Sequence, residues 1–192
     1  MRHPLRLRGT LALVASVAAC AVIASPAAAQ SGGASSPAPT TPTTPTTTTP
    51  GVATLNADGS ATAPADAPRA VRKAINAANR IRLKPYVYGG GHRTWKAKGY
   101  DCSGAVSYVL HAAGLLKKRP LASGGLASMW GTDGIGQWIT VYANKGHAYA
   151  VIAGLRWDTS AVGEPLNNGS GPRWRSTARS STGYRAKYRP GL

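Results

Sequence analysis

Cysteine is scarce in this sequence, which contains only Cys20 and Cys102. Cys20 falls in a segment that we expect to be removed on export, so Cys102 has no intramolecular partner and a structural disulfide is excluded. An unpaired thiol in an exported chain is either an intermolecular bridge or a reactive group, and the bland alternative is a small buried hydrophobe. The role of Cys102 is therefore the main question that the sequence raises.

Long apolar runs are also missing, because no segment reaches the roughly eighteen apolar residues of a membrane span. The longest run, about residues 11–24, follows three arginines and precedes Ala27-Ala28-Ala29. This pattern is typical of a secretory signal peptide, here residues 1–29, and it predicts a secreted or cell-wall protein without a transmembrane span. The alternative is a lipoprotein signal that ends at Cys20, in which a lipidated Cys20 would anchor the mature chain.

Acidic residues are few, because six Asp and Glu stand against 23 Lys and Arg and give a formal charge of +17. Removal of residues 1–29 takes away three arginines and leaves +14. Such a surface attracts polyanions. An exported chain meets anionic cell-wall polymers and lipid head groups, and we expect such polymers as partners. No basic helix is interleaved with stacking aromatics, so nucleic acid is a weak alternative. One remaining cysteine and three scattered histidines form no ligand-spaced cluster, so neither a metal nor another cofactor is expected.

Composition divides the rest of the chain in two. Residues 30–68 consist mainly of Ser, Thr, Pro, Ala and Gly and include the stretch PAPTTPTTPTTTTPG. They offer too little apolar surface to offset the entropy of ordering, so we predict a disordered linker, which serves either as a spacer or as a tail without a role. Residues 69–192 have the right size for one domain with its own core, and we expect a monomer.

Apolar spacing within residues 69–192 predicts helices followed by strands. The stretch RAVRKAINAANRIRL has apolar residues at helical spacing and predicts a helix that ends before Lys84-Pro85. The stretch SGAVSYVLHAAGLL predicts a second helix that begins at Cys102. The stretches QWITVYA, HAYAVIAG and LRWDTS predict three successive strands, with a tight turn near Ala153-Gly154 between the last two. This order predicts an α+β domain with an antiparallel sheet.

The position of Cys102 favours a reactive thiol. It starts the second predicted helix, where unpaired N–H groups and the helix dipole stabilise an anion and lower the pKa of a thiol. Asp101 and Ser103 are natural capping residues, and Gly104 lets a substrate or another backbone come close. The amides at the helix start can also donate to an oxyanion formed beside the sulfur, so one turn of chain would supply both the nucleophile and charge stabilisation.

A cysteine nucleophile needs a base, and the mature chain offers His92, His111 and His147. His111 lies about 180° around the predicted helix from Cys102, so we expect an ordinary exposed residue. His92 lies in a glycine-rich loop, which positions a base less well than a rigid element does. We favour His147 because it begins a predicted strand. The hairpin that follows would bring Asp158 alongside His147 to orient its ring, and the alternative for Asp158 is a solvated carboxylate.

The elements PYVYGGG, YDCSGAVSYVLHAAGL and GHAYAVIAG together resemble the NlpC-type cell-wall cysteine peptidases. These are papain-like enzymes that cut peptide cross-links and stems of bacterial peptidoglycan, and the likeness spans roughly residues 71–158. It implies a papain-like α+β fold, with Cys102 as nucleophile, His147 as base and Tyr86 as a tyrosine that reaches the site. Family members usually complete the set with His, Asn or Gln, where this chain has Asp158. That departure implies either a triad completed by Asp or a divergent, inactive member.

The resemblance implies a function and leaves two rivals open. The leading expectation is hydrolysis of an amide bond in peptidoglycan stem peptides, with γ-D-glutamyl-diaminopimelate as the usual target of the family. One rival is an inactive, basic peptidoglycan-binding protein on the same scaffold, and the other is an amidase or transpeptidase. The region after Asp158 has no motif that the resemblance covers. Six Lys and Arg follow Gly171, and they indicate either a wall-binding patch or a solvated basic edge.

Overall fold

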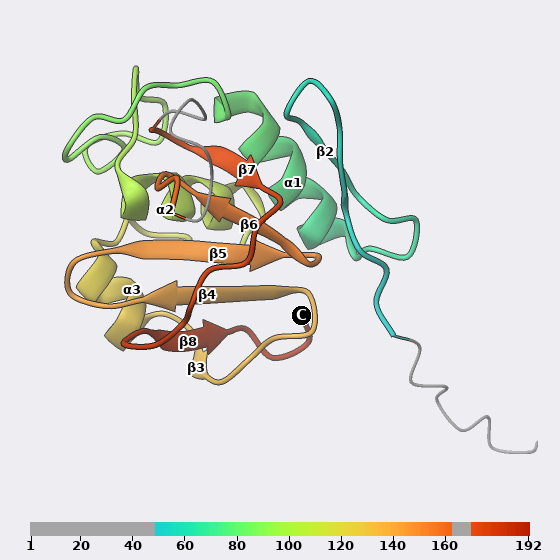
Figure 1. Ribbon diagram of the computed structural model, residues 1–192. Helices are drawn as coiled ribbons and strands as arrows, with labels where there is room; N and C mark the ends of the chain where they lie inside the picture. The colour runs from blue at the N-terminus through green and yellow to red at the C-terminus, as the bar shows by residue number, and fades with distance from the viewer. Residues whose placement is uncertain (1–48, 163–169) are drawn as a thin grey trace, which may run out of the picture. The chain divides into compact units, whose positions relative to one another are not determined.

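The computed structural model describes residues 49–162 and 170–192 (Figure 1). Three helices lie within them, α1 (Arg69–Ile81), α2 (Cys102–Ala112) and α3 (Ser123–Met129). The strands are β1 (Thr54–Leu55), β2 (Ala61–Thr62), β3 (Thr132–Asp133), β4 (Ile139–Ala143), β5 (Ala148–Ile152), β6 (Leu155–Asp158), β7 (Arg173–Arg175) and β8 (Arg185–Tyr188). None of these helices is long and apolar enough to cross a membrane. The predicted signal peptide, residues 1–29, and residues 30–48 of the predicted linker lie outside the described residues.

The larger sheet is antiparallel with the strand order β3-β8-β4-β5-β6-β7, so the predicted α+β class is confirmed. Its centre consists of the three successive strands that the sequence predicts, β4, β5 and β6. The turn between β5 and β6 has two residues, Ala153 and Gly154, and both have a positive φ. Positive φ at both positions is the geometry of a type I′ turn, whose twist matches that of the flanking strands. The turn therefore sets the register that brings β6 back beside β5.

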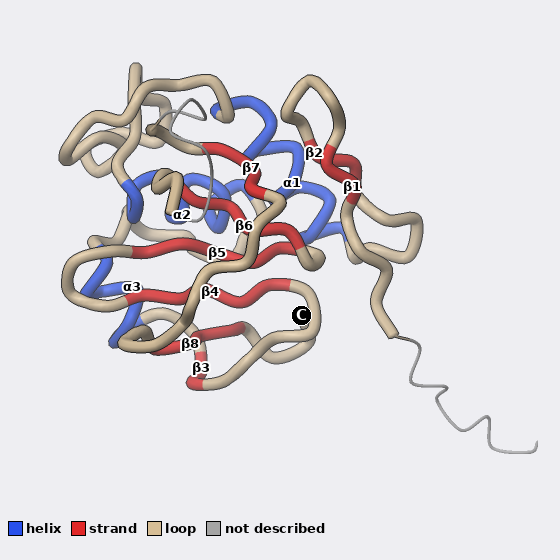
Figure 2. Tube along the Cα trace, in the orientation of Figure 1, coloured by secondary structure: helices blue, strands red, loops and turns tan. Residues whose placement is uncertain are grey.

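The core lies between the helices and one face of the sheet. Figure 2 shows α1 and α2 running behind β5, β6 and β7. The helical spacing predicted for α1 is confirmed, since its buried side chains recur on one face. Small side chains in β5 let α2 lie close to this strand, which brings the start of α2 to the sheet. The buried residues of the two central strands include Ile139, Val141 and Ala143 of β4 and Ala148, Ala150 and Ile152 of β5.

Residues 49–68 form structure, which corrects the prediction of a disordered linker over this stretch. They contain the hairpin of β1 and β2 and bury Ala53, Ala61 and Ala67 in the core. Asn79 of α1 holds the hairpin, because its Nδ2 donates to the Ala61 carbonyl at 2.8 Å and its Oδ1 accepts the Ala61 N–H at 2.9 Å. A segment poor in apolar residues is ordered here because the rest of the domain supplies its partners.

The basic C-terminal region completes the sheet. β7 pairs with β6, and β8 lies between β3 and β4. Between these strands, residues 176–184 cross the face of the sheet opposite α1 and α2 (Figure 1), and we call them the crossing segment. Arg175 and Lys187 are buried. Neither a wall-binding patch nor a solvated edge describes these two residues, because both are buried within the sheet.

Replacement of Asn79 by alanine should lower the free energy of unfolding by about 2–4 kcal/mol, because it leaves three polar groups without a partner. These are the N–H and carbonyl of Ala61 and the indole N–H of Trp174, which donates to Asn79 Oδ1 at 2.8 Å. Asn76→Ala, at an exposed position of the same helix, is the matched control and should change the free energy by less than about 0.5 kcal/mol. Chemical denaturation measures both, and equal effects would contradict this role for Asn79.

Candidate active site

Cys102 begins α2, as the sequence predicts, and is only 8% exposed. Asp101 is the N-cap of the helix, and its Oδ1 accepts the Gly104 N–H at 2.7 Å. The N–H groups of Cys102 and Ser103 precede the first intrahelical hydrogen bond, and neither has an acceptor in the described part of the chain. These two amides are therefore available to a negatively charged atom beside the sulfur.

The Asp101 carboxylate also fixes the glycine-rich loop that precedes the helix. It accepts the Gly89 N–H at 3.1 Å, and its Oδ1 lies 3.0 Å from His92 Nε2. The loop lies so close to α2 that a Cβ on Gly104 would collide with the Gly90 carbonyl oxygen. Only glycine fits at position 104, and the backbone that comes close is that of the loop itself. Asp101 is thus a scaffold residue that ties the loop to the helix start.

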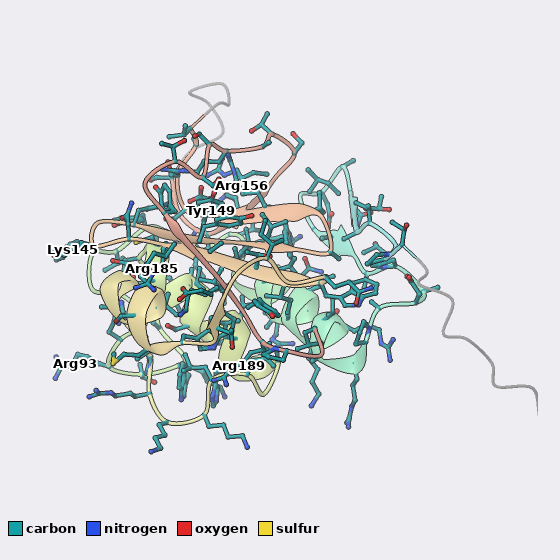
Figure 3. All side chains as sticks on the ribbon, turned by 90° about the horizontal axis from the view of Figure 1, so that it is seen from below. Arg93, Lys145, Tyr149, Arg156, Arg185 and Arg189 are labelled. Atoms are coloured by element: carbon teal, nitrogen blue, oxygen red, sulfur yellow. The ribbon has the colours of Figure 1, made fainter. Side chains whose placement is uncertain are left out.

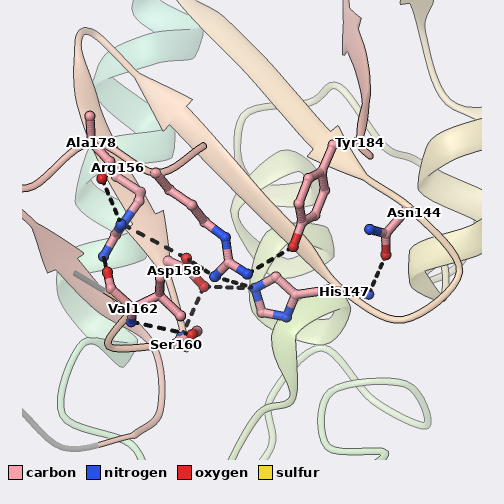
Figure 4. Close-up of polar contacts among 9 residues, drawn as sticks. Asn144, His147, Arg156, Asp158, Ser160, Val162, Ala178 and Tyr184 are labelled. Carbon is pink, nitrogen blue, oxygen red and sulfur yellow. Dashed lines mark hydrogen bonds and ion pairs between the residues drawn. The ribbon is translucent and has the colours of Figure 1, made fainter. Parts of the chain in front are cut away.

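His147 and Asp158 meet beside the thiol, as the predicted hairpin requires. His147 directly precedes β5, and Asp158 ends β6. The imidazole Nε2 lies 2.9 Å from Asp158 Oδ1, and Figure 4 shows the carboxylate against the ring. The backbone before β5 is fixed by Asn144, whose Oδ1 accepts the His147 N–H at 2.9 Å. The alternative of a solvated carboxylate does not hold, because the Asp158 side chain is completely buried.

The electrostatics favour a thiolate paired with an imidazolium. Burial raises the pKa of the Cys102 thiol, but a hydrogen bond and charge from His147 and the N–H of Ala148 bring the pKa below its ordinary value. Burial lowers the pKa of His147, but Asp158 and Cys102 outweigh burial and raise this pKa to about 9. Burial also opposes ionisation of Asp158, yet hydrogen bonds from His147 and the Ser160 N–H keep its pKa below the ordinary value. Because Nε2 faces Asp158, Nδ1 is the nitrogen left for the sulfur.

Two arginines hold the far side of Asp158, and the sequence did not reveal them. Arg179 of the crossing segment donates from Nη1 to Asp158 Oδ2 at 3.1 Å and from Nη2 to the Tyr184 hydroxyl at 2.8 Å. Its guanidinium also lies 5.4 Å from the ring centroid of Tyr149. Arg156 Nε lies 3.7 Å from Asp158 Oδ2. No sequence motif includes Arg179. Its position near Asp158 could have been predicted only by identifying RWR as a strand that pairs with LRWD, because the segment that contains Arg179 follows RWR.

The remaining predicted site residues lie around this centre. Tyr86 is 41% exposed. Burial, followed by the charges of Cys102 and Asp101, raises the pKa of Tyr86, whose backbone pairs with Tyr100, two residues before Cys102. The Ser103 hydroxyl lies 3.2 Å from both Asp101 Oδ1 and His92 Nε2. Through its side chain Ser103 therefore serves the loop, and through its backbone N–H it faces the site.

The other two histidines have structural partners. His92 contacts the cap of α2, as described above. His111 was predicted to be exposed, and this prediction was wrong. Its ring stacks on Trp95 with centroids 3.9 Å apart, and its Nδ1 lies 2.9 Å from the Leu116 carbonyl oxygen. A loop outside the helix covers the face that helical periodicity alone assigns to solvent. In residues 49–162 and 170–192, no three His, Cys, Asp or Glu side chains are grouped to hold a metal.

Comparisons with known proteins include one distant structural likeness. No family model and no curated protein matches this sequence. Among solved structures, a similar one is Rv1477, a hypothetical invasion protein of Mycobacterium tuberculosis, with a TM-score of 0.43 and 21% identity over 62% of this chain. The match spans 64% of the length of that protein. Interpretation of the site therefore depends on its own residues and on the sequence motifs.

Iodoacetamide should alkylate Cys102 with a rate that rises through a midpoint below pH 9.0, because His147 lowers the pKa of the thiol from that ordinary value. Asp158→Asn removes the charge that raises the pKa of His147, so the ring becomes neutral at a lower pH. The midpoint should then move up toward 9.0. Mass spectrometry of the Cys102 peptide measures the rate at each pH.

The control for this experiment is Asp66→Asn, the same chemical change at an exposed carboxylate. It should leave the midpoint of Cys102 alkylation where it is in the unaltered protein. If Asp158→Asn also leaves the midpoint in place, the coupling of Asp158 to the thiol through His147 is wrong.

Arg179→Met should lower the free energy of unfolding at neutral pH by about 2–3 kcal/mol, because it removes one partner of a buried charge. The pKa of Asp158 in the folded protein lies below its ordinary value of 3.8. The stability that the ionised carboxylate contributes is therefore fully present above pH 3.8, and it is lost as the pH falls through the folded-state pKa. The difference between variant and unaltered protein should therefore narrow below that pH. Denaturation at several pH values measures it.

Arg185→Met is the matched control for Arg179→Met, because it removes an ion pair with the exposed Asp133. Solvent screens such a pair, so its loss should change stability little at any pH. A loss in Arg179→Met that stays constant down to acidic pH would assign the effect to packing over Tyr149 and not to the charge of Asp158.

Proposed function

We propose that the protein is a cysteine hydrolase that cleaves an amide bond in the stem peptides of peptidoglycan. The observation that supports this most is the 2.9 Å hydrogen bond between His147 Nε2 and Asp158 Oδ1, in a pair that lies beside Cys102 at a helix start. A nucleophile, a base and a residue that orients the base are the parts that acyl transfer by a thiol requires. A thiol at a helix start and an imidazole directly before a strand are also consistent with the papain-like arrangement that the motifs imply.

The reaction begins when the Cys102 thiolate attacks the carbonyl carbon of the amide. The carbonyl oxygen becomes an oxyanion, which accepts hydrogen bonds from the N–H groups of Cys102 and Ser103. As the C–N bond breaks, the His147 imidazolium gives its proton to the leaving amine, and the acyl group remains on the sulfur as a thioester. Water then attacks the thioester while His147 takes one of its protons. The carboxylic acid leaves, and the thiolate–imidazolium pair is restored.

Asp158 stands where the resembled family has His, Asn or Gln, and a carboxylate suits this place. An acceptor at Nε2 orients the His147 ring so that Nδ1 faces the sulfur, and its negative charge stabilises the imidazolium. Arg179 and Arg156 keep the carboxylate ionised without solvent. These contacts favour an active enzyme over the inactive binding protein that the departure at Asp158 suggests.

The proposed substrate class depends on the sequence. The elements around Tyr86, Cys102 and His147 resemble those of peptidoglycan peptidases, and the predicted signal peptide would deliver the chain to the cell wall. The positive charge of the chain suits an anionic wall. From the resemblance we propose the bond between γ-D-glutamate and diaminopimelate as the one that is cut.

Purified protein should release peptide fragments from peptidoglycan, and Cys102→Ala should reduce this release to the background rate. Asp158→Ala should lower kcat/KM by about 100-fold or more, because the His147 ring loses both its orientation and its counter-charge. Asp66→Asn, which changes an exposed carboxylate, should keep full activity. Release by Cys102→Ala equal to that by the unaltered protein would overturn the proposal.

Mass spectrometry of the fragments identifies the bond. Ends at γ-D-glutamate and diaminopimelate support the proposed endopeptidase. Release of whole stem peptides would assign an amidase instead, and new cross-links between stems would assign a transpeptidase. Either of these results would keep the Cys102 chemistry and replace the proposed bond.

A further inference from the structure

A groove with a basic rim extends toward the active site from the chain that follows β8. Its wider part is a cavity of about 650 Å³ between this chain and the loop after α2. A second hollow of about 410 Å³ continues the first and ends at His92. The His92 ring contacts Asp101 and Ser103, the two neighbours of Cys102. We call the two hollows together the basic groove, and the residues that line both are Arg119, Leu121 and Met129.

Four exposed cations line the basic groove. Arg189 lies with its guanidinium 5.7 Å from the ring centroid of Trp130, which holds this cation at the rim. Figure 3 shows Arg189 well apart from Tyr149 and Arg156, so the basic groove is separate from the sheet face over Asp158. The four cations are Lys117, Lys118, Arg119 and Arg189.

The cations of the basic groove have no acidic partner among the described residues. All five acidic residues in the described ranges are engaged elsewhere. Three of them have partners at the surface, namely Asp58, Asp66 and Asp133. The other two, Asp101 and Asp158, belong to the proposed active site. In a chain of formal charge +17, this concentration of unpaired cations creates a field that an anion from outside can neutralise.

We propose that the basic groove binds a linear polyanion, and specifically a polymer with repeated phosphodiester groups. Lysine ammonium groups attract phosphate as point charges, and the guanidinium forks of Arg119 and Arg189 match two phosphate oxygens at once. Leu121 and Met129 supply apolar surface for the uncharged parts of the repeat. Two joined hollows suit a chain better than a single compact anion.

An anionic membrane fits these observations less well. The cations line the walls of a groove that also contains apolar side chains, whereas a bilayer needs cations that project together from one surface. A polymer chain enters such a groove and reaches His92 from it. A bound polymer would keep the Cys102 thiol beside a cell-wall substrate. Only this consequence of the inference rests on the proposed function.

The test measures binding of a fluorescently labelled oligo(glycerol phosphate) to the Cys102→Ala protein, which cannot form the acyl-enzyme. Reversal of two charges in Lys117→Glu/Lys118→Glu should weaken binding about tenfold or more at low ionic strength. Arg69→Glu/Lys73→Glu makes the same change of net charge at exposed positions of α1 and is the matched control, with an affinity within about twofold of the parent. Salt should weaken binding by the parent protein steeply.

Each other result overturns a part of the proposal. Equal losses in the two double variants would assign binding to net charge and not to the groove. Binding of oligoglutamate as tight and as sensitive to Lys117→Glu/Lys118→Glu would overturn the choice of phosphodiesters. Binding to vesicles with about 30% anionic lipid, but not to the oligomer, would assign a membrane. Failure of the proposed hydrolysis would not change any of these results, because every binding measurement uses the Cys102→Ala protein, which has no thiol.

Discussion

One buried carboxylate, that of Asp158, determines how the candidate active site is put together. Its side chain is fully shielded from water, and a buried charge is stable only when it is paired and hydrogen-bonded. The partners come from three separate parts of the chain, the residue before β5, β6 itself and the crossing segment, as His147, Arg156 and Arg179. The elements that surround the thiol are therefore the ones that must come together to pair the charge of Asp158.

The thiol lies between two carboxylates that act on it in opposite ways. Asp158 acts through His147, whose hydrogen bond and charge lower the pKa of Cys102. Asp101 is adjacent to Cys102, and its charge raises the same pKa. This opposing effect accompanies the cap and the contacts to the glycine-rich loop, without which the helix start and its available amides would not be in place. The site therefore combines a carboxylate that builds its geometry with one that sets its charge.

Patterns close together in the chain were sufficient to predict that His147 and Asp158 meet. A strand, a two-residue turn and a strand bring together two residues that are eleven positions apart, so the contact of His147 with Asp158 follows from periodicity and the turn at Ala153-Gly154. Arg179 contacts Asp158 from 21 residues further on, and its position depends on the path of the crossing segment, which no local pattern encodes.

The errors in the sequence predictions share a physical cause. Residues 49–68 have the composition of a disordered segment, but their order depends on Asn79 in α1 and on burial of Ala53, Ala61 and Ala67 in a core made by other residues. Likewise, the exposure expected for His111 ignored Trp95, which covers it from a loop. In both cases the missing information was the identity of a tertiary neighbour, which composition and periodicity do not contain.

The hairpin of β1 and β2 also determines how a pull on the preceding chain is transmitted to the domain. The Ala53 N–H donates to the Ala153 carbonyl at 2.8 Å, at the turn between β5 and β6. This turn is the end of the two strands that lies away from His147 and Asp158. Tension on the chain before β1 would therefore enter the sheet at this turn and not at the end that carries the candidate site.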